Sequence, residues 1–495
     1  MWFSISIFVF IWLRLTVAYA AIARRADLKA LLTSTRWSAK TIISFPGSES
    51  FTNATERWTV FDPPTYSAAI SPSTEADLVK AVQLATSNGI PFLATGGRHG
   101  YTTTLGDLNE GLAIDLSLFN RLEIDKSAGT IKVGGGVRFR DIYDPVYTAG
   151  FEIQLGTASC PGMVGVTLGA GVGPWGGVHG LLIDALLSLR VVTAGGRVIN
   201  VSKKSYPDLF WAFRGAGANF GIVVSATYKL QEQVNEGESL VADVIIPAEK
   251  NASYFELLQS YDGSLPENLS ISSFITYNWT IDAPQITASW AYIGPEADGR
   301  IEFAPLLALE PIIGAIAVYP WNKVITSVAG GADAGLCLDG GTHNIYTLNA
   351  RNLSAPTYEA TFEKYSLFYK EYPEARGSSL QIAIFPNQAA LSVPDSETAY
   401  AWRDTLAHVD IVFSWGSAER DLTEVTDVLG RELRGDFAAT AGYPDLAVYV
   451  NSAHGDETLE QIYGARKLPR LAALKKAWDP ENVFGFNNAL PTRYP

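Results

Sequence analysis

The spacing of hydrophobic residues alternates along the chain between a helical and a strand-like period. Apolar side chains at Leu78 and Ala85 fall on one face of a predicted helix, with Thr74 as its cap and Gly89 as its stop signal. Residues 90–94 are almost all apolar and lead into a glycine-rich turn, which predicts a buried strand. This part of the chain is therefore expected to connect helices to buried strands through glycine-rich turns.

Two further patterns indicate antiparallel strands and a late helix. Residues 189–194 and 197–201 are strand-like and flank two glycines, which is the signal of a hairpin. Residues 130–133 alternate as a strand before three glycines. From Leu471 to Trp478 the apolar positions return to the helical period.

Glycine content divides the chain into regions. Residues 60–232 are dense in glycine, whereas residues 233–439 contain less of it and show no obvious motif. The last 50 residues are again helical in pattern. We predict two lobes, the first of which is completed by the C-terminal tail.

Composition excludes several classes of protein. Of the 495 residues, 47% are hydrophobic and only 18% are charged, so the chain can bury large cores and is not disordered. The net charge of −14 disfavours binding to nucleic acid. Two cysteines and five scattered histidines provide neither a disulfide scaffold nor a zinc-ligand cluster, so we expect no metal site.

The first twenty residues are predicted to be a signal peptide. Residues 3–13 form an apolar run too short to span a membrane comfortably, and Ala18-Tyr19-Ala20 fits a cleavage site. Because Arg14 interrupts the apolar stretch and no basic residue precedes it, an uncleaved anchor stays the alternative. Secretory passage would permit glycosylation at six Asn-x-Ser/Thr sequons. They begin at Asn53, Asn200, Asn251, Asn268, Asn278 and Asn352.

Common nucleotide and hydrolase motifs are absent or incomplete. Residues 171–176 match GxGxxG, but small residues rather than a hydrophobic strand precede them, and Pro174 lacks a backbone donor. No GxSxG elbow, phosphate-binding P-loop or HExxH motif occurs. We interpret residues 171–176 as backbone packed closely against something flat.

Four segments carry the chemical signal. They are 96–100 (Gly-Gly-Arg-His-Gly), the glycine-rich 156–173, 207–223 (Pro-Asp-Leu-Phe-Trp through Asn-Phe-Gly-Ile-Val), and 449–451 (Tyr-Val-Asn) with 479–487. In this order the set resembles the FAD-linked oxidases of the vanillyl-alcohol oxidase fold, specifically the berberine-bridge-enzyme-like branch. The resemblance covers roughly residues 60–232 and 440–495.

This resemblance implies an α+β fold. It would contain a PCMH-type FAD-binding domain of two small α/β subdomains, and a substrate domain with an antiparallel sheet covered by helices. The implied boundaries are 1–20 for the signal peptide, 21–232 for the FAD-binding domain, 233–439 for the substrate domain and 440–495 for a C-terminal segment that completes the FAD lobe.

The same segments supply the expected FAD site. A glycine-rich turn offers several backbone N–H groups to a pyrophosphate, and small side chains let backbone approach a flat ring. The residues expected to bind the cofactor are Thr95, Gly96, Gly97, Arg98, His99, Gly100, Ala158, Cys160, Gly165, Gly169, Gly171, Asn219, Gly221, Ile222, Val223, Asn451 and Asn487.

Covalent attachment of the flavin is implied at one or two positions. In the family the histidine matching His99 bonds to the flavin C8 methyl group, although Arg98 stands where relatives usually have glycine. Many relatives add a second link from a cysteine, and the family spacing places that position at Ala158 rather than Cys160. A loop shift could bring Cys160 to the ring, whereas a buried thiol or a disulfide with Cys337 stays the alternative.

The resemblance implies hydride transfer from a small organic substrate to FAD, with O2 as acceptor and H2O2 as product. A base is needed for the substrate proton, and relatives supply it from different positions. Some relatives carry a tyrosine directly after the residue matching Asn451, but this chain has Ser452. We expect Tyr449, His454 or Tyr101 to replace it, in that order.

Two other functions stay open. A carbohydrate oxidase that forms lactones would be expected to carry two flavin links. A secreted flavoprotein without turnover would explain the lack of a recognisable base. In each case the expected partners are small molecules and O2, with no nucleic acid and no membrane after signal cleavage, and the sequence leaves the oligomeric state open.

Overall fold

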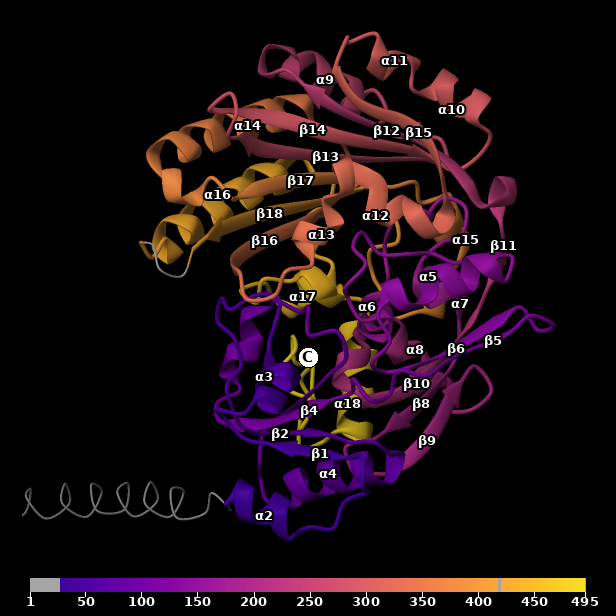
Figure 1. Ribbon diagram of the computed structural model, residues 1–495, viewed down its shortest axis with the longest axis vertical. Helices are drawn as coiled ribbons and strands as arrows, with labels where there is room; N and C mark the ends of the chain where they lie inside the picture. The colour runs from indigo at the N-terminus through magenta and orange to yellow at the C-terminus, as the bar shows by residue number, and fades with distance from the viewer. Residues whose placement is uncertain (1–26, 417–419, 495) are drawn as a thin grey trace, which may run out of the picture.

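The computed structural model describes residues 27–416 and 420–494. The molecule has two lobes, with the lower one built largely from the first half of the chain and the upper one from the middle (Figure 1). The predicted signal peptide lies outside the described residues. Within the described ranges, no helix is both long and apolar enough to cross a membrane.

The first subdomain of the lower lobe is a four-stranded sheet. Its order is β1 (Ile42–Ser44), β2 (Tyr66–Ser71), β4 (Gly111–Asp115) and β3 (Phe92–Thr95), with β4 parallel to both β2 and β3. Helices α2 (Leu28–Ser34), α3 (Glu49–Thr55) and α4 (Glu75–Ser87) accompany it. The Thr74 side chain accepts from the Asp77 N–H and caps α4, which confirms the predicted helix start.

The second subdomain is a five-stranded antiparallel sheet. Its order is β5 (Leu122–Asp125), β6 (Thr130–Gly134), β10 (Ile222–Lys229), β8 (Leu186–Val192) and β9 (Val198–Ser202). Helices α5 (Phe139–Thr148), α6 (Met163–Gly169), α7 (Leu182–Ala185) and α8 (Pro207–Ala216) belong to this region. The predicted hairpin at Gly195-Gly196 is confirmed as β8–β9.

The upper lobe contains a seven-stranded antiparallel sheet. Its order is β15 (Ile312–Pro320), β12 (Glu238–Ile246), β14 (Ala283–Tyr292), β13 (Leu269–Asn278), β17 (Ser379–Ile384), β18 (Ala407–Trp415) and β16 (Thr342–Ala350). Helices α9 (Asn251–Gln259), α14 (Ala355–Glu371) and α16 (Thr423–Thr440) cover the upper face in the view of Figure 1, with α10 (Glu296–Glu302) and α11 (Ala304–Leu307) at one end. A large hydrophobic core lies between this face and the helices.

Strand register separates the two faces of this sheet. Tyr346 and Leu348 lie on the face covered by α16, because the Tyr346 hydroxyl donates to Asp427 on that helix. Thr347 pairs with Asp410, so both point to the opposite face. The sheet therefore presents a polar face toward the lower lobe.

The C-terminal segment returns to the lower lobe. Helices α17 (Leu459–Tyr463) and α18 (Leu468–Trp478) lie there in Figure 1, and α18 packs against α8. The fully buried Lys475 ammonium donates to the Asn219 carbonyl and pairs with Asp479 (2.7 Å), which holds the following turn in place. The α+β fold is thus confirmed, with the first lobe completed by the tail, whereas the four domain boundaries stay predictions.

Helices from the middle of the chain connect the lobes. Helix α12 (Trp321–Gly331) packs against both α5 and β12, and α13 (Asp333–Leu336) follows it between the large sheet and the lower lobe (Figure 1). Cys337, directly after α13, forms a disulfide with Cys160. The pairing that the sequence left open therefore joins the two lobes covalently.

Candidate functional site

A cavity in the lower lobe brings the four sequence segments together. It encloses about 950 Å³, including open solvent at its mouth. The predicted residues that line it are Gly96, Gly165, Gly169, Gly221, Ile222, Val223, Asn451 and Asn487. Lining residues that the sequence analysis did not assign include Gly135, Leu168, Gly217, Tyr463, Phe484 and Phe486. The glycine run 134–136 was a signal for one of them.

Glycines shape the cavity in two different ways. A Cβ on Gly96 would lie 2.4 Å from the Gly135 carbonyl oxygen, and one on Gly97 would lie 2.2 Å from the Gly162 nitrogen. Only glycine therefore allows the turn to approach these loops. A Cβ on Gly165 would meet no protein atom within 4 Å, so this glycine leaves space in the cavity itself. Such a bare wall fits a flat ring.

The structure explains the unusual arginine of this turn. Arg98 has a φ of +57°, in the left-handed region that favours glycine. Its guanidinium forms an ion pair with Asp115 (2.8 Å) and donates to the Glu56 carbonyl (2.9 Å). These bonds stabilise a backbone conformation that is otherwise costly for a residue with a side chain.

His99 is held by ring stacking. Its ring is stacked on Trp58, with centroids 4.4 Å apart, and its buried Nε2 atom has no hydrogen-bond partner. Burial lowers the pKa of His99 to about 4, with the cation of Arg138 acting in the same direction. The imidazole is therefore neutral and keeps a lone pair, as attachment to a flavin requires.

Other predicted cofactor residues, among them Thr95, Gly100 and Asn219, do not line the cavity and are fixed by hydrogen bonds to neighbouring segments. The fully buried Asn219 donates to the Tyr463 hydroxyl (3.0 Å) and accepts from the Leu490 N–H (2.8 Å). The carbonyl oxygen of Gly100 accepts from Arg57 (2.6 Å), and that of Thr95 accepts from the Leu116 N–H (2.9 Å).

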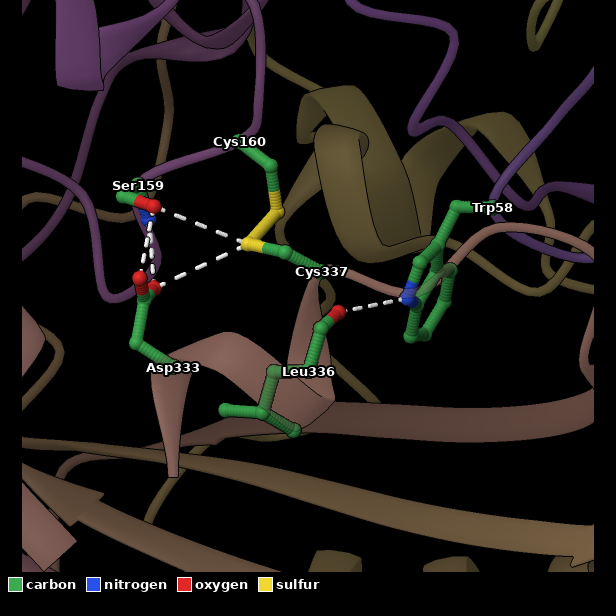
Figure 2. The surroundings of a disulfide bond; sticks show 6 residues. All are labelled: Trp58, Ser159, Cys160, Asp333, Leu336 and Cys337. Carbon is green, nitrogen blue, oxygen red and sulfur yellow. Dashed lines mark hydrogen bonds between the residues drawn. A yellow bond between two sulfur atoms is a disulfide. The ribbon is translucent and has the colours of Figure 1, made fainter. Parts of the chain in front are cut away.

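The possible second flavin link through Cys160 is contradicted by the structure. The Cys160 sulfur is bonded to Cys337, so it is not free to form a thioether (Figure 2). The neighbouring Ser159 donates to Asp333 through both its N–H (2.8 Å) and its hydroxyl (2.6 Å), which fixes the loop. Ala158 has no thiol, so neither of the two positions considered provides a second link.

Tyr449 and Asn451 brace the glycine-rich wall. The Tyr449 hydroxyl accepts from the Gly171 N–H (3.0 Å) and from the Asn451 amide (2.7 Å), and that amide also donates to the Val166 carbonyl (2.8 Å). Gly171 has a φ of +74°, which suits glycine. Burial raises the pKa of Tyr449 to about 12. These contacts favour a structural role over a catalytic base.

Tyr101 feels the charge of a carboxylate, Asp410, that the sequence analysis missed. The Tyr101 hydroxyl is within hydrogen-bonding reach of Ser452. Burial raises the pKa of Tyr101, and the negative charge of Asp410 raises it further. Burial raises the pKa of Asp410 itself to about 6. None of the described residues donates a side-chain hydrogen bond to this carboxylate. Asp410 is therefore an acid without a side-chain partner among the described residues, and its neighbour across the strands, Thr347, bonds Ser452, which directly follows the cavity residue Asn451.

A signal for Asp410 exists in the sequence. Residues 407–411 alternate between apolar and polar side chains, and Asp410 is the only acid in residues 407–415. Around it on the polar face are Thr347 and Gln381, which pair with Asp410 from the two neighbouring strands. The Thr347 hydroxyl donates to the Ser452 carbonyl (2.7 Å), which ties this face to the cavity.

His454 lies on the other side of the sheet. Its ring stacks on Tyr346 with centroids 4.1 Å apart, and its Nδ1 bonds the Ile345 carbonyl (3.0 Å). Tyr346 belongs to the face under α16, away from Asp410. This geometry disfavours His454 as the base. Among the described residues, no three His, Cys, Asp or Glu side chains are arranged to hold a metal ion.

Comparisons with known proteins agree with this site. Residues 66–202 match the family described as "FAD binding domain", and residues 448–491 match the family "Berberine and berberine like". The chain is 47% identical to the FAD-linked oxidoreductase srdI of Neurospora crassa over 473 residues, which are 95% of this chain and 94% of that protein.

Two solved structures have the same fold. They are the BBE-like 1 protein of Physcomitrella patens (TM-score 0.82, 22% identity) and the glucooligosaccharide oxidase of Acremonium strictum (TM-score 0.81, 24% identity). Each comparison covers 95% of this chain and 100% of the other. By its sequence relatives and its domains, the chain belongs to the berberine-bridge-enzyme-like family of FAD-linked oxidoreductases.

Proposed function

We propose that this protein is an oxidase that takes a hydride from a small organic molecule, an aromatic or polyketide-type secondary metabolite, and passes the electrons to O2. The observation that carries the proposal is the Asp410 carboxylate, half-buried and without a side-chain partner among the described residues, on the polar sheet face. Bound FAD supplies a hydride acceptor and gives its electrons to O2, which leaves as H2O2.

Asp410 is the proposed base. With a pKa raised to about 6, the carboxylate is ionised at neutral pH yet is more basic than an ordinary aspartate. It removes the proton from the substrate O–H or N–H group while the neighbouring C–H bond loses its hydride. Tyr101, which stays protonated because burial raises its pKa, donates a hydrogen bond to the substrate oxygen. Ser452 and Gln381 help to orient the substrate on this face.

His99 is the proposed point of covalent attachment. Its neutral imidazole and unpartnered Nε2 suit a nucleophile, and the glucooligosaccharide oxidase is described as carrying 6-S-cysteinyl, 8α-N1-histidyl FAD. In this chain the Cys160–Cys337 disulfide supports a single link through the histidine.

The two alternatives are less well supported. A carbohydrate oxidase is suggested by the glucooligosaccharide oxidase, but the Cys160–Cys337 disulfide weighs against the double link expected of it. A flavoprotein without turnover was suggested by the missing base, and Asp410 removes that reason.

The test of the proposed function combines flavin chemistry with turnover. Acid precipitation of the purified protein should leave a yellow pellet, whereas the pellet of His99→Ala should be colourless. Peroxide release is then measured on a panel of phenols, benzylic alcohols and oligosaccharides. A colourless wild-type pellet would refute the attachment, and release on oligosaccharides alone would favour the carbohydrate oxidase.

We also propose that the protein passes through the secretory route. The proposal is supported by the disulfide, which suits an oxidising compartment, and by the exposed sequons at Asn53, Asn200 and Asn352. Treatment of the protein from its native host with a glycosidase should lower its mass. An unchanged mass for a protein found inside the cell would refute this route.

A further inference from the structure

Trp58 lies at the centre of a three-ring stack. One face of the indole stacks on His99 (centroids 4.4 Å apart, planes at 13°), and it also stacks on His343 (4.5 Å, 22°). Trp58 is almost completely buried. Because the Nε2 atom of His99 has no hydrogen-bond partner, the stack supplies the contact that orients this ring.

A disulfide-bonded segment of the upper lobe holds Trp58. We call residues 333–341 the strap. The indole N–H donates to the Leu336 carbonyl (2.7 Å), and the next residue, Cys337, is bonded to Cys160 (Figure 2). At its far end the Gly340 N–H donates to the Arg57 carbonyl (2.8 Å) and the Gly341 N–H to the Trp58 carbonyl (3.2 Å). The strap therefore contacts Trp58 through both its side chain and its backbone.

The other ring of the stack is also fixed. His343 lies two residues after the strap and begins the polar side of β16, where its Nδ1 bonds the Ser414 hydroxyl (2.7 Å). Its backbone N–H donates to the Thr59 hydroxyl (3.1 Å). The stack is thus anchored in the upper lobe on one side, and the lower-lobe imidazole of His99 lies on the other.

From this geometry we infer that Trp58, held by the strap, is a positioning residue that orients the His99 imidazole for covalent attachment of the flavin. The inference rests on the proposed attachment at His99. An imidazole whose Nε2 has no hydrogen bond is held less firmly and could otherwise sample several rotamers, of which only one directs the reacting nitrogen at the cofactor. The same strap binds the Cys160 sulfur, so it fixes the reactive histidine while it occupies the cysteine.

The test compares two replacements of the indole. Trp58→Phe keeps an aromatic ring against His99, whereas Trp58→Leu keeps apolar bulk without a ring, and both lose the bond to Leu336. Each protein, produced with little flavin, is incubated with excess FAD, quenched in acid at intervals, and assayed for flavin in the pellet. We expect Trp58→Leu to form the covalent link about tenfold more slowly than wild type and Trp58→Phe to stay within about threefold of it.

Matched controls separate positioning from folding. Trp279→Ala removes a tryptophan that is 68% exposed and should leave the rate unchanged. The flavin that acid releases into the supernatant reports non-covalent binding, which should persist in Trp58→Leu if the fold is intact. The double variant Cys160→Ser/Cys337→Ser loosens the strap without leaving a free thiol and should also slow attachment, which gives a second measurement if Trp58→Leu does not fold.

The outcomes are distinguishable. A wild-type protein that binds FAD but yields a colourless pellet overturns the attachment at His99 and this inference together. A coloured wild-type pellet with equal rates for Trp58→Leu and Trp58→Phe overturns the positioning role alone. An unchanged rate in the double cysteine variant overturns the part assigned to the strap.

Discussion

The sharpest prediction concerns Asp410→Asn. The change keeps the size of the side chain and removes its ability to ionise, so it separates the proposed base from the packing around it. A general base contributes about 10²–10⁴-fold to the rate of such a reaction. We therefore expect the rate of flavin reduction by a substrate found in the peroxide screen to fall by at least about a hundredfold.

The same substitution should lower activity but raise the free energy of unfolding at neutral pH. Burial raises the pKa of Asp410 from 3.8 to about 6. Between these values the folded protein binds a proton that the unfolded chain has lost, so the contribution of this group to stability is largest below pH 4 and is lost as the pH rises through 6. At about 1.4 kcal/mol per pKa unit, the loss is about 3 kcal/mol, an upper figure because the side chain is partly exposed.

Two assays check this prediction. Denaturant unfolding at pH 4 and pH 7 should show that Asp410→Asn gains up to about 3 kcal/mol relative to wild type at the higher pH, because asparagine has no proton to lose. The pH profile of wild-type flavin reduction should rise through an inflection near pH 6. Asp410 is not the base if the variant keeps that inflection, or if its rate of flavin reduction stays within about tenfold of wild type.

Substitutions at three further positions probe the cavity wall and the turn. Tyr449→Phe should keep the rate of flavin reduction within about tenfold of wild type but lower the unfolding free energy by about 1–3 kcal/mol, because the Gly171 N–H loses its acceptor. A fall of about a hundredfold in the rate would instead identify Tyr449 as the base. Arg98→Ala should lower the free energy of unfolding by about 3 kcal/mol in chemical denaturation, because Asp115 loses its partner. Arg98→Gly should lower it by less, since glycine accepts the left-handed φ. Equal losses for the two variants would contradict backbone strain at this position. Gly165→Leu should leave the unfolding midpoint of flavin-free protein unchanged and lower the flavin absorbance per protein, whereas normal flavin content would contradict the location of the ring.

Local patterns were sufficient for much of the lower lobe. The helix after Thr74, the β8–β9 hairpin and the terminal helix α18 all form where the spacing of apolar residues and glycines predicts. These features depend on neighbours within a few residues, such as the Thr74 hydroxyl and the Asp77 N–H. Glycine-rich segments likewise indicated the cavity wall, because backbone that approaches a flat ring needs small side chains.

The proposed catalytic face could not be predicted from local patterns. Asp410 and Tyr101 are separated by more than 300 positions in the chain, and their proximity depends on how the upper sheet docks on the lower lobe. His454 and Asp410 are both titratable residues of the last hundred positions of the chain. Strand register and the stacking on Tyr346 nevertheless place the histidine on the opposite side of the sheet from Asp410. Residue type suggested His454 as a candidate base, but only the tertiary structure shows on which side of the sheet each candidate lies.

The amino-acid sequence alone determined the family resemblance, the α+β class that this resemblance implies, and the glycine-lined wall. Each depends on contiguous motifs or on the spacing of nearby residues. Tertiary structure decided that Cys160 bonds Cys337, that Trp58 stacks on His99, and that the charge of Asp410 acts on Tyr101. Each of these interactions joins segments far apart in the chain, and it depends on the docking of whole sheets and helices rather than on any local preference of the residues involved.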